Sequence, residues 1–351
     1  MKKNNCIHIL ASVLLVLLSS CQESKKYSGA ELISFSDFKG PISLKGDSLA
    51  FDDILLKPVK IHLVDSFLIM KNRNTEQTYY IFNVFTKKKI CECVPFGIGP
   101  GEMIDPRFIP SADGNIWIFD KNRQVLCICD RQTFLQGESL IVNKSIKFEN
   151  FCNNIVPIPG KGFIASIFDK NKRFGLFNQN GDTICHKGEY PELSSLTTHI
   201  EQVEGFMSEF TVNTEENRIF VSYSRTDLIE YYDTDMNLIK RIHGPEHFFP
   251  EVHQEGDRIA TNKGAERDAY YCPLSVGKKV FVLYSGKFFN PMNHDYLKDK
   301  ILVFDWNGAP QQYYQLDTPI FDFAVDEKRG VIYGLTDKPE SHIVQFNFNA
   351  L

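Results

Sequence analysis

Long apolar stretches and excess basic charge are both scarce in this sequence. The prominent apolar run, Ile7–Leu18, has about a dozen residues, whereas a membrane-spanning helix needs about 20. Lysine and arginine total 39 against 44 aspartate and glutamate residues, and the formal net charge is -5 at pH 7. Because a nucleic-acid-binding protein needs a basic face, this composition argues against a nucleic-acid partner.

Helix-forming stretches rich in Ala, Leu and Glu are also missing, while 29 phenylalanines and 14 tyrosines favour strands. The sequence has no G-x-S-x-G motif and no C-x-x-C pair, so it offers neither a nucleophile elbow nor a cysteine zinc set. The pairs Cys91/Cys93 and Cys127/Cys129 could each present two thiols on one strand face. We favour the alternative, in which these cysteines are small buried hydrophobic residues.

The first residues predict export and lipid anchoring. Lys2 and Lys3 precede the apolar run, which has the length of a signal-peptide core. Leu18-Ser19-Ser20-Cys21 then has the form of a bacterial lipobox, which predicts cleavage before Cys21 and lipidation of its thiol. An ordinary signal peptide with a chance cysteine is the alternative. We therefore expect a signal peptide over residues 1–20, a lipidated tether over 21–29, and one domain over 30–351 in the cell envelope.

One sequence pattern occurs six times after the tether. It consists of a strand rich in β-branched or aromatic residues, a polar turn, and a second strand that ends at Asn or Asp. The closing residues are Asn83, Asp130, Asn178, Asp233, Asp305 and Asn347. Further short strands flank each copy, giving four strands in units of roughly 50 residues. Six four-stranded units predict an all-β, six-bladed β-propeller; a solenoid would need shorter units.

The sixth unit ends before a fourth strand can follow. An exposed sheet edge would remain unless another segment completes the last blade. The alternating segment "AELISFSDF", residues 30–38, is the expected N-terminal closing strand.

The glycine-rich stretch "GIGPGEMIDP" lies between the first and second units. A dinucleotide-binding loop needs G-x-G-x-x-G before a helix, whereas here the spacing is G-x-G-x-G with Pro100 inside it. Related Gly, Glu and Pro combinations recur in "HKGEYP" and "HGPEHFFP", two other linkers. The stretch is therefore predicted to be a blade-to-blade corner.

The linker "FGIGPGE" and the segments "DGNIWIFDKNRQVLCICD", "KVFVLYSGK" and "ILVFDWNGAPQQYYQLDTPIFDFAVDEKRGVIYGL" together resemble exported bacterial lipoproteins with six-bladed, TolB-like or NHL-like propellers. The resemblance covers about residues 90–350. It implies the same fold and an envelope location, and it implies little about activity.

Propellers bind ligands where loops from all blades converge. Some six-bladed enzymes, such as calcium-dependent lactonases, hold a metal there with acidic and amide side chains from several blades. The corresponding metal candidates are Glu102, Asp120, Asn122 and Asp169, with calcium as the cofactor. The alternative interpretation is that the aspartates of the repeated "FDKN" motif stabilise turns. We favour turns, and expect no cofactor.

Basic and aromatic residues near the expected channel mouth are the candidates for ligand binding: Arg107, Arg225, Arg267, Tyr270 and Tyr284. The tyrosines could instead pack between blades. An insertion in the fifth unit, residues 287–298, predicts a contact loop with Phe288, Phe289 and Tyr296.

Two functions remain open at this level. The favoured one is a monomeric, non-catalytic binding or scaffold module for an envelope protein or glycan partner, which contacts the membrane only through its lipid anchor. The other is a metal-dependent hydrolase or lactonase with its site at the central channel.

Overall fold

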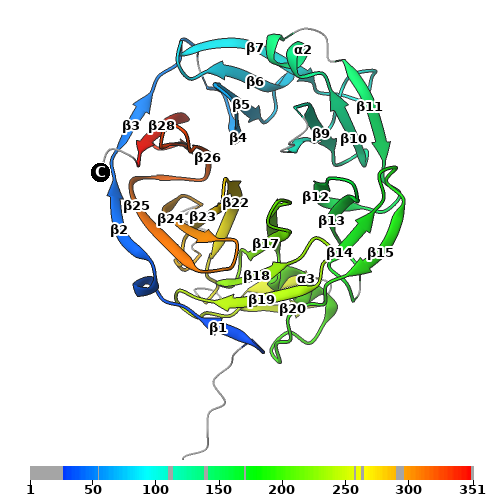
Figure 1. Cartoon of the computed structure of the whole chain (residues 1–351), viewed down its shortest axis with the longest axis vertical. Coiled ribbons are helices and arrows are strands. Elements are labelled where there is room, and N and C mark those ends of the chain that lie inside the picture. The colour runs from blue at the N-terminus through cyan, green and yellow to red at the C-terminus, as the bar shows by residue number, and fades with distance from the viewer. Residues whose placement is uncertain are drawn as a thin grey trace, which may run out of the picture.

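The computed structural model describes residues 27–53, 55–109, 114–137, 141–169, 171–256, 258–261, 265–289 and 296–348. Cys21 and the expected signal peptide lie outside these ranges. Six sheets stand around a central axis as the blades of a propeller (Figure 1), which confirms the predicted fold. Within the described ranges, no helix is long and apolar enough to cross a membrane.

The blades follow the six repeats in chain order. Blade 1 contains β4 (Pro58–Val64), β5 (Phe67–Asn72), β6 (Gln77–Asn83) and β7 (Lys88–Pro95). Blade 2 contains β8 (Pro106–Ile109), β9 (Ile116–Asp120), β10 (Val125–Cys129) and β11 (Val142–Lys147). Blade 3 contains β12 (Cys152–Ile158), β13 (Gly162–Ile167), β14 (Phe174–Phe177) and β15 (Thr183–Lys187).

The second half of the chain forms the other three blades. Blade 4 contains β16 (Ser208–Asn213), β17 (Arg218–Tyr223), β18 (Leu228–Tyr232) and β19 (Leu238–His243). Blade 5 contains β22 (Tyr270–Val276), β23 (Lys279–Tyr284), β24 (Lys298–Asp305) and β25 (Pro310–Ile320). Blade 6 contains β26 (Asp322–Asp326), β27 (Val331–Thr336), β28 (His342–Asn347) and, from the N-terminal part of the chain, β3 (Gly46–Leu49).

In blades 1 to 5, the Asn or Asp that closes the repeat begins the connection to the fourth strand. The Asn83 side-chain oxygen accepts the N–H groups of Phe85 and Thr86 at 2.9 and 3.0 Å. Asp233 and Asp305 accept backbone N–H groups two and four residues further on. Asp130 instead caps the short helix α2 (Arg131–Gln136). The recurring residue is thus a turn-forming side chain in blade after blade.

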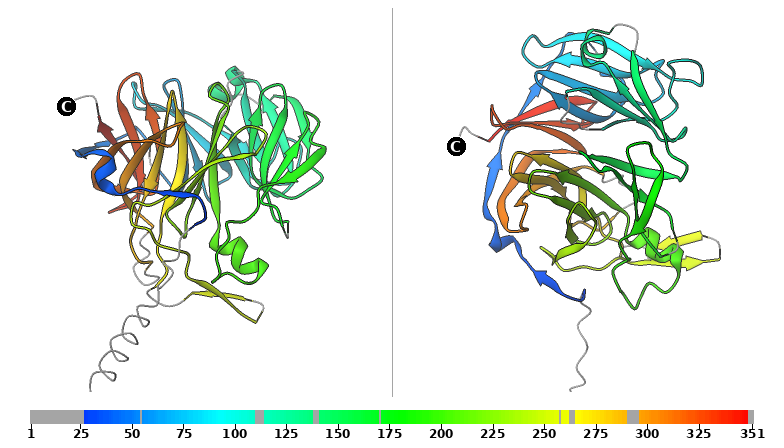
Figure 2. Two further views of the ribbon diagram at one scale, coloured as in Figure 1. Left: turned by 60° about the horizontal axis from the view of Figure 1, so that its bottom comes forward. Right: turned by 45° about the vertical axis from the view of Figure 1, so that its right-hand side comes forward.

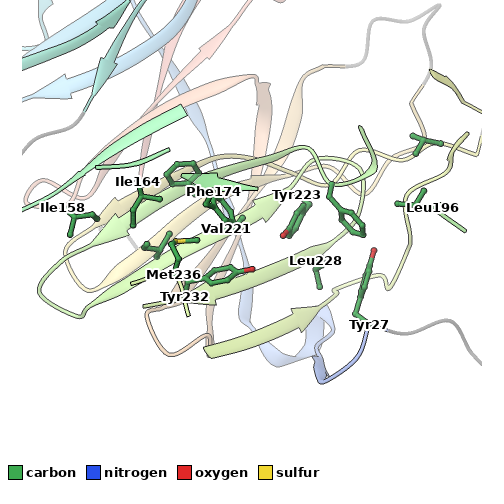
Figure 3. Packing of buried hydrophobic residues seen from close by; sticks show 14 residues of the cluster. Tyr27, Ile158, Ile164, Phe174, Leu196, Val221, Tyr223, Leu228, Tyr232 and Met236 are labelled. Atoms are coloured by element: carbon green, nitrogen blue, oxygen red, sulfur yellow. The ribbon is translucent and has the colours of Figure 1, made fainter. Parts of the chain in front are cut away.

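Hydrophobic side chains fill the spaces between neighbouring blades. Between blades 3 and 4, Phe174 and Ile164 belong to one cluster with Val221 and Tyr232 (Figure 3). Every residue of β18 is buried, because both faces of this central strand meet other parts of the protein. Burial of each large side chain contributes about 1.5–3 kcal/mol.

An N-terminal strand closes the ring, as predicted, but the predicted segment 30–38 is wrong. The strand in blade 6 is β3, which pairs antiparallel with β28 from Gly46 opposite Phe346 to Leu49 opposite Ile343. Segment 30–38 instead provides β1 (Ala30–Leu32), which adds a fifth strand to blade 4 parallel to β19, and the short 3-10 helix η1 (Phe35–Asp37). The chain then forms β2 (Lys39–Leu44) beside β25 of blade 5 before it reaches blade 6.

Alternating strand direction gives the propeller two different ends. The linkers between blades and the turns from second to third strands lie at one end, which we call the linker face. The other turns lie at the opposite end, the turn face. Helix α3 (His199–Gly205) and the hairpin β20 (Val252–Glu255)–β21 (Arg258–Thr261) belong to linkers and project together from one side of the propeller (Figure 2).

The glycine-rich stretch is a corner of the linker face, as predicted. Gly101 has a φ of 79° and Gly188, in a matching linker, has a φ of 72°. A side chain at these positions would be strained, since only glycine adopts this region freely. Glu102 completes the corner by accepting the Gly99 N–H at 2.8 Å.

The closing strand can be tested by comparing two leucines. Leu49 of β3 is 4% exposed, whereas Leu32 of β1 is 61% exposed. Leu49→Ala should lower the free energy of unfolding by about 2–4 kcal/mol, as for other buried leucines. Leu32→Ala should change it by less than about 0.5 kcal/mol. Urea denaturation of both variants measures this, and an equal loss for the two would contradict closure by β3.

Candidate functional site

A cavity of about 1410 Å³ runs along the propeller axis. The first strand of every blade contributes to its wall, namely β4, β8, β12, β16, β22 and β26. These strands begin at the linker face with polar residues and continue towards the turn face with apolar ones. For example, β4 contributes Lys60 near its start and Leu63 and Val64 at its end. The inner strands are therefore polar at the linker end of the channel and mainly apolar towards the turn end.

Blades 1 and 2 place several cations around one carboxylate. Lys71 Nζ lies 2.6 Å from Asp105 Oδ1, and Arg107 Nη2 lies 3.4 Å from Asp105 Oδ2. Burial acts to raise the pKa of Asp105, but Lys71 and Arg107 hold it below its ordinary value. Arg107 also donates to the Asn153 carbonyl oxygen and the Asn154 side-chain oxygen at 3.3 and 3.2 Å.

Lys121 adds a further positive charge beside this group. Burial, together with repulsion from Arg107 and Lys71, lowers the pKa of Lys121, and attraction to Asp105 offsets this only partly. Its ammonium group lies 5.6 Å from the centre of the Phe151 ring. Arg73 also lines the cavity. We call this group the cationic wall (Lys71, Arg73, Arg107 and Lys121). Lys71, Arg73 and Arg107 line the cavity, and Lys71, Arg107 and Lys121 interact with Asp105.

The channel wall carries a second, compensated ion pair, between blades 1 and 6. Lys60 Nζ lies 3.2 Å from both Asp322 Oδ1 and Cys272 Sγ. Glu209 accepts the Cys272 backbone N–H at 2.8 Å. Burial acts to lower the pKa of Lys60, but Asp322 in particular raises it well above its ordinary value. Burial also raises the pKa of the Cys272 thiol, which opposes formation of a nucleophilic thiolate.

His62 follows Lys60 along β4, nearer the turn face, and stacks on Phe108 with 4.7 Å between the ring centres. Burial and the charges of Lys60 and Lys71 lower its pKa from 6.5 to about 3. The imidazole is therefore neutral near pH 7 and belongs to the apolar part of the channel wall.

The five sequence-predicted ligand residues occupy different surroundings. Arg107 lines the channel. Tyr270 and Tyr284 are at most 1% exposed and lie 5.1 Å apart between ring centres, packed between blades. Arg225 pairs with Glu204 and Glu266, and Arg267 pairs with Glu246 and stacks on Phe248. The structure thus leaves Arg107 as the one of these five that faces the described cavity.

The carboxylates among the four metal candidates have local partners, and Asn122 donates its backbone N–H to one of them. Asp120 accepts backbone N–H groups from Ile104, Asp105 and Asn122, as a turn-stabilising residue does. Glu102 bonds to Gly99, and Asp169 lies 2.6 Å from His186 Nδ1. In the ranges that the structure describes, no three His, Cys, Asp or Glu side chains are grouped so that they could hold a metal.

The predicted contact loop exposes its aromatic residues on the linker face. Phe288 pairs with Arg267 in an isolated β-bridge and lies beneath its guanidinium group, with 5.2 Å from the guanidinium carbon to the ring centre. Phe289 and Tyr296 are also exposed. The Tyr296 hydroxyl donates to Asp337 in the corresponding turn of blade 6.

Sequence comparison identifies the family from a match over most of the propeller. The family model for the TolB-like six-blade propeller matches residues 34–328. The chain belongs to the TolB-like six-bladed propeller family. No curated protein matches this TolB-like chain in sequence.

Two solved structures from Bacteroides share the fold of this TolB-like propeller. A DUF4221 family member from Bacteroides vulgatus is 11% identical, with a TM-score of 0.58 over 88% of this chain and 97% of its own. An exported-protein candidate from Bacteroides fragilis is 13% identical, with a TM-score of 0.55 over 91% of this chain and 98% of its own. At these identities the likeness concerns the fold alone.

The lowered pKa of His62 makes the stability of this TolB-like propeller depend on pH. The unfolded chain takes up this proton near pH 6.5, whereas the folded chain resists it until about pH 3. Stability should therefore fall as pH drops below 6.5, by about 1 kcal/mol between pH 7 and pH 5.5. His62→Phe keeps the ring stack and should remove that part of the loss. Urea denaturation at both pH values measures the difference, and an identical pH dependence in the variant would contradict it.

The metal candidates lead to a second test. Because the carboxylates of Glu102 and Asp120 stabilise backbone turns, EDTA should leave the thermal midpoint unchanged. Elemental mass spectrometry before and after chelation provides the check. Stoichiometric calcium, with a lower midpoint after its removal, would favour the metal-dependent hydrolase instead.

Proposed function

We propose that this protein is a lipid-anchored propeller of the cell envelope, at the outer membrane, which acts as a non-catalytic binding module. Its partner is a protein or glycan that presents a carboxylate to the channel. The lipobox at Cys21 and the likeness to the exported-protein candidate from Bacteroides fragilis support the location.

The observation that carries the binding role is the cationic wall. Lys71 and Arg107 share the single carboxylate of Asp105, and Lys121 and Arg73 lie on the same side. An incoming carboxylate would relieve repulsion among these cations and accept charge-assisted hydrogen bonds. The cavity of about 1410 Å³ has room for several sugar rings or a short peptide segment. An acidic ligand therefore fits this wall better than a neutral one.

Arg107→Gln tests this binding role. An oligogalacturonate is a suitable acidic probe, and its methyl ester is the neutral counterpart. The substitution should weaken oligogalacturonate binding about tenfold, since hydrogen bonds to charged groups contribute about 1.5–3 kcal/mol. Arg218→Gln, outside the channel on the turn side of β17, is the matched control and should bind like the wild type. Isothermal titration calorimetry at low and high salt measures both.

The two partner classes give different results in this experiment. Binding of oligogalacturonate but not its methyl ester supports an acidic glycan. An acidic peptide that binds with the same Arg107 dependence, where oligogalacturonate does not, supports a protein partner. Equal binding of acidic and neutral probes, or no effect of Arg107→Gln on any ligand that binds, would contradict the proposed role of the cationic wall.

A further inference from the structure

Exposed aromatic side chains are concentrated on one end of the propeller. The described residues include seven aromatic side chains that are strongly exposed, and six of them belong to linkers or turns of the linker face: Phe96, Phe151, Phe168, Phe288, Phe289 and Tyr296. The seventh, Phe85, lies in a turn of the turn face. Apolar residues of the same linkers, including Ile98 at 80% exposure, extend this surface.

The aromatic residues form part of a firmly held surface. Phe151 and Phe168, from different connections of neighbouring blades, stack with 5.9 Å between their ring centres. Near Phe288, the Asp227 carboxylate accepts the backbone N–H groups of Glu246, His247 and Phe248, which fixes the linker that meets Arg267. These apolar side chains are therefore presented to the exterior by ordered connections.

The N-terminal segment enters the propeller at this same face. The Tyr27 hydroxyl bonds to Thr226 Oγ1 at 3.0 Å, and Thr226 donates to the Phe248 carbonyl oxygen. The Tyr27 ring also packs against Phe206 and Phe249, which lie in two linkers.

The length of the tether limits how far this face can stand from a membrane. Tyr27 follows Cys21 by six residues, and six fully extended residues span at most about 20 Å. A lipid on Cys21 therefore holds the Tyr27 side of the linker face close to the bilayer surface. A propeller held this way would bring its exposed aromatic side chains towards the headgroups, where such side chains are favoured.

We propose that the linker face docks on the lipid bilayer, with Phe168 and Phe288 inserted among the headgroups and upper acyl chains. This inference rests on the lipid anchor of the proposed function. The lipid holds the protein at the membrane, and the aromatic residues fix its orientation. The Lys121 ammonium group lies beside the Phe151 ring, where it can reach lipid phosphates, whereas Lys287, next to Phe288 in the sequence, pairs with Asp299 at 3.1 Å.

Docking leaves the other end of the channel open. Pro159, Gly160 and Thr214, which lie at the turn face, also line the cavity. A ligand for the cationic wall therefore has an entrance on the side away from the membrane.

Tryptophan reporters distinguish docking from simple tethering. Phe168 and Phe288 on the linker face and Phe85 on the turn face are all 58% exposed, so Phe85→Trp is a matched control for Phe168→Trp and Phe288→Trp. Each variant is produced as the full, lipidated chain and reconstituted in phosphatidylcholine vesicles with or without brominated acyl chains. The wild type supplies the baseline from the two native tryptophans.

Docking predicts that bromolipid quenches the added tryptophan at 168 and at 288 at least threefold more than the one at 85. Bromine quenches only over short distances, so a tether without insertion would leave all three reporters equal. Equal quenching in protein that floats with the vesicles would overturn docking and leave the lipid anchor intact. Failure of the wild type to float would contradict the anchor, and docking with it.

Discussion

Pairing between β3 and β28 joins the two ends of the ring, and the arrangement of the other blades depends on it. Without β3, blade 6 would have three strands and an exposed edge, and its neighbours would lose the cluster that includes Leu49, Ile61 and Ile343. The N-terminal chain also runs as β1 and β2 along the outer edges of blades 4 and 5. The segment from β1 to β3 therefore pairs with three of the six blades. Tyr27, just before it, packs at the linker face.

Polar contacts between blades supplement this closure. Arg173 of blade 3 lies buried against blade 4, where its guanidinium donates to Glu230 at 2.8 Å and to the hydroxyl of Tyr232. Arg241 reaches the other oxygen of the same carboxylate at 2.6 Å. Burial acts to raise the pKa of Glu230, but these two cations keep it below its ordinary value. Such a buried ion-paired cluster fixes the register between blades more than it adds net stability.

The sequence predicts the blades well because each blade is built from local interactions. Residues such as Asn83 and Asp233 bond within their own turns, so one repeated pattern is enough to locate six units. The closing strand was not predictable in this way. The segment "GDSL" is short and poor in strand-forming residues. It can pair with β28 because Gly46, which has no side chain, fits beside Val344 and Phe346. Segment 30–38 has the better strand pattern but lies beside blade 4.

The channel site was predicted only in part for a related reason. Arg107 was identified by its type and position, and Asp105 lies two residues before it, but Lys71 reaches Asp105 from blade 1. No repeated sequence pattern predicts the contact between Lys71 and Asp105, because it forms only when blades 1 and 2 pack side by side. The same packing places the polar beginnings of the inner strands at the linker end and apolar residues at the turn end. A ligand that enters from the turn face therefore passes apolar side chains before its acidic group reaches Arg107.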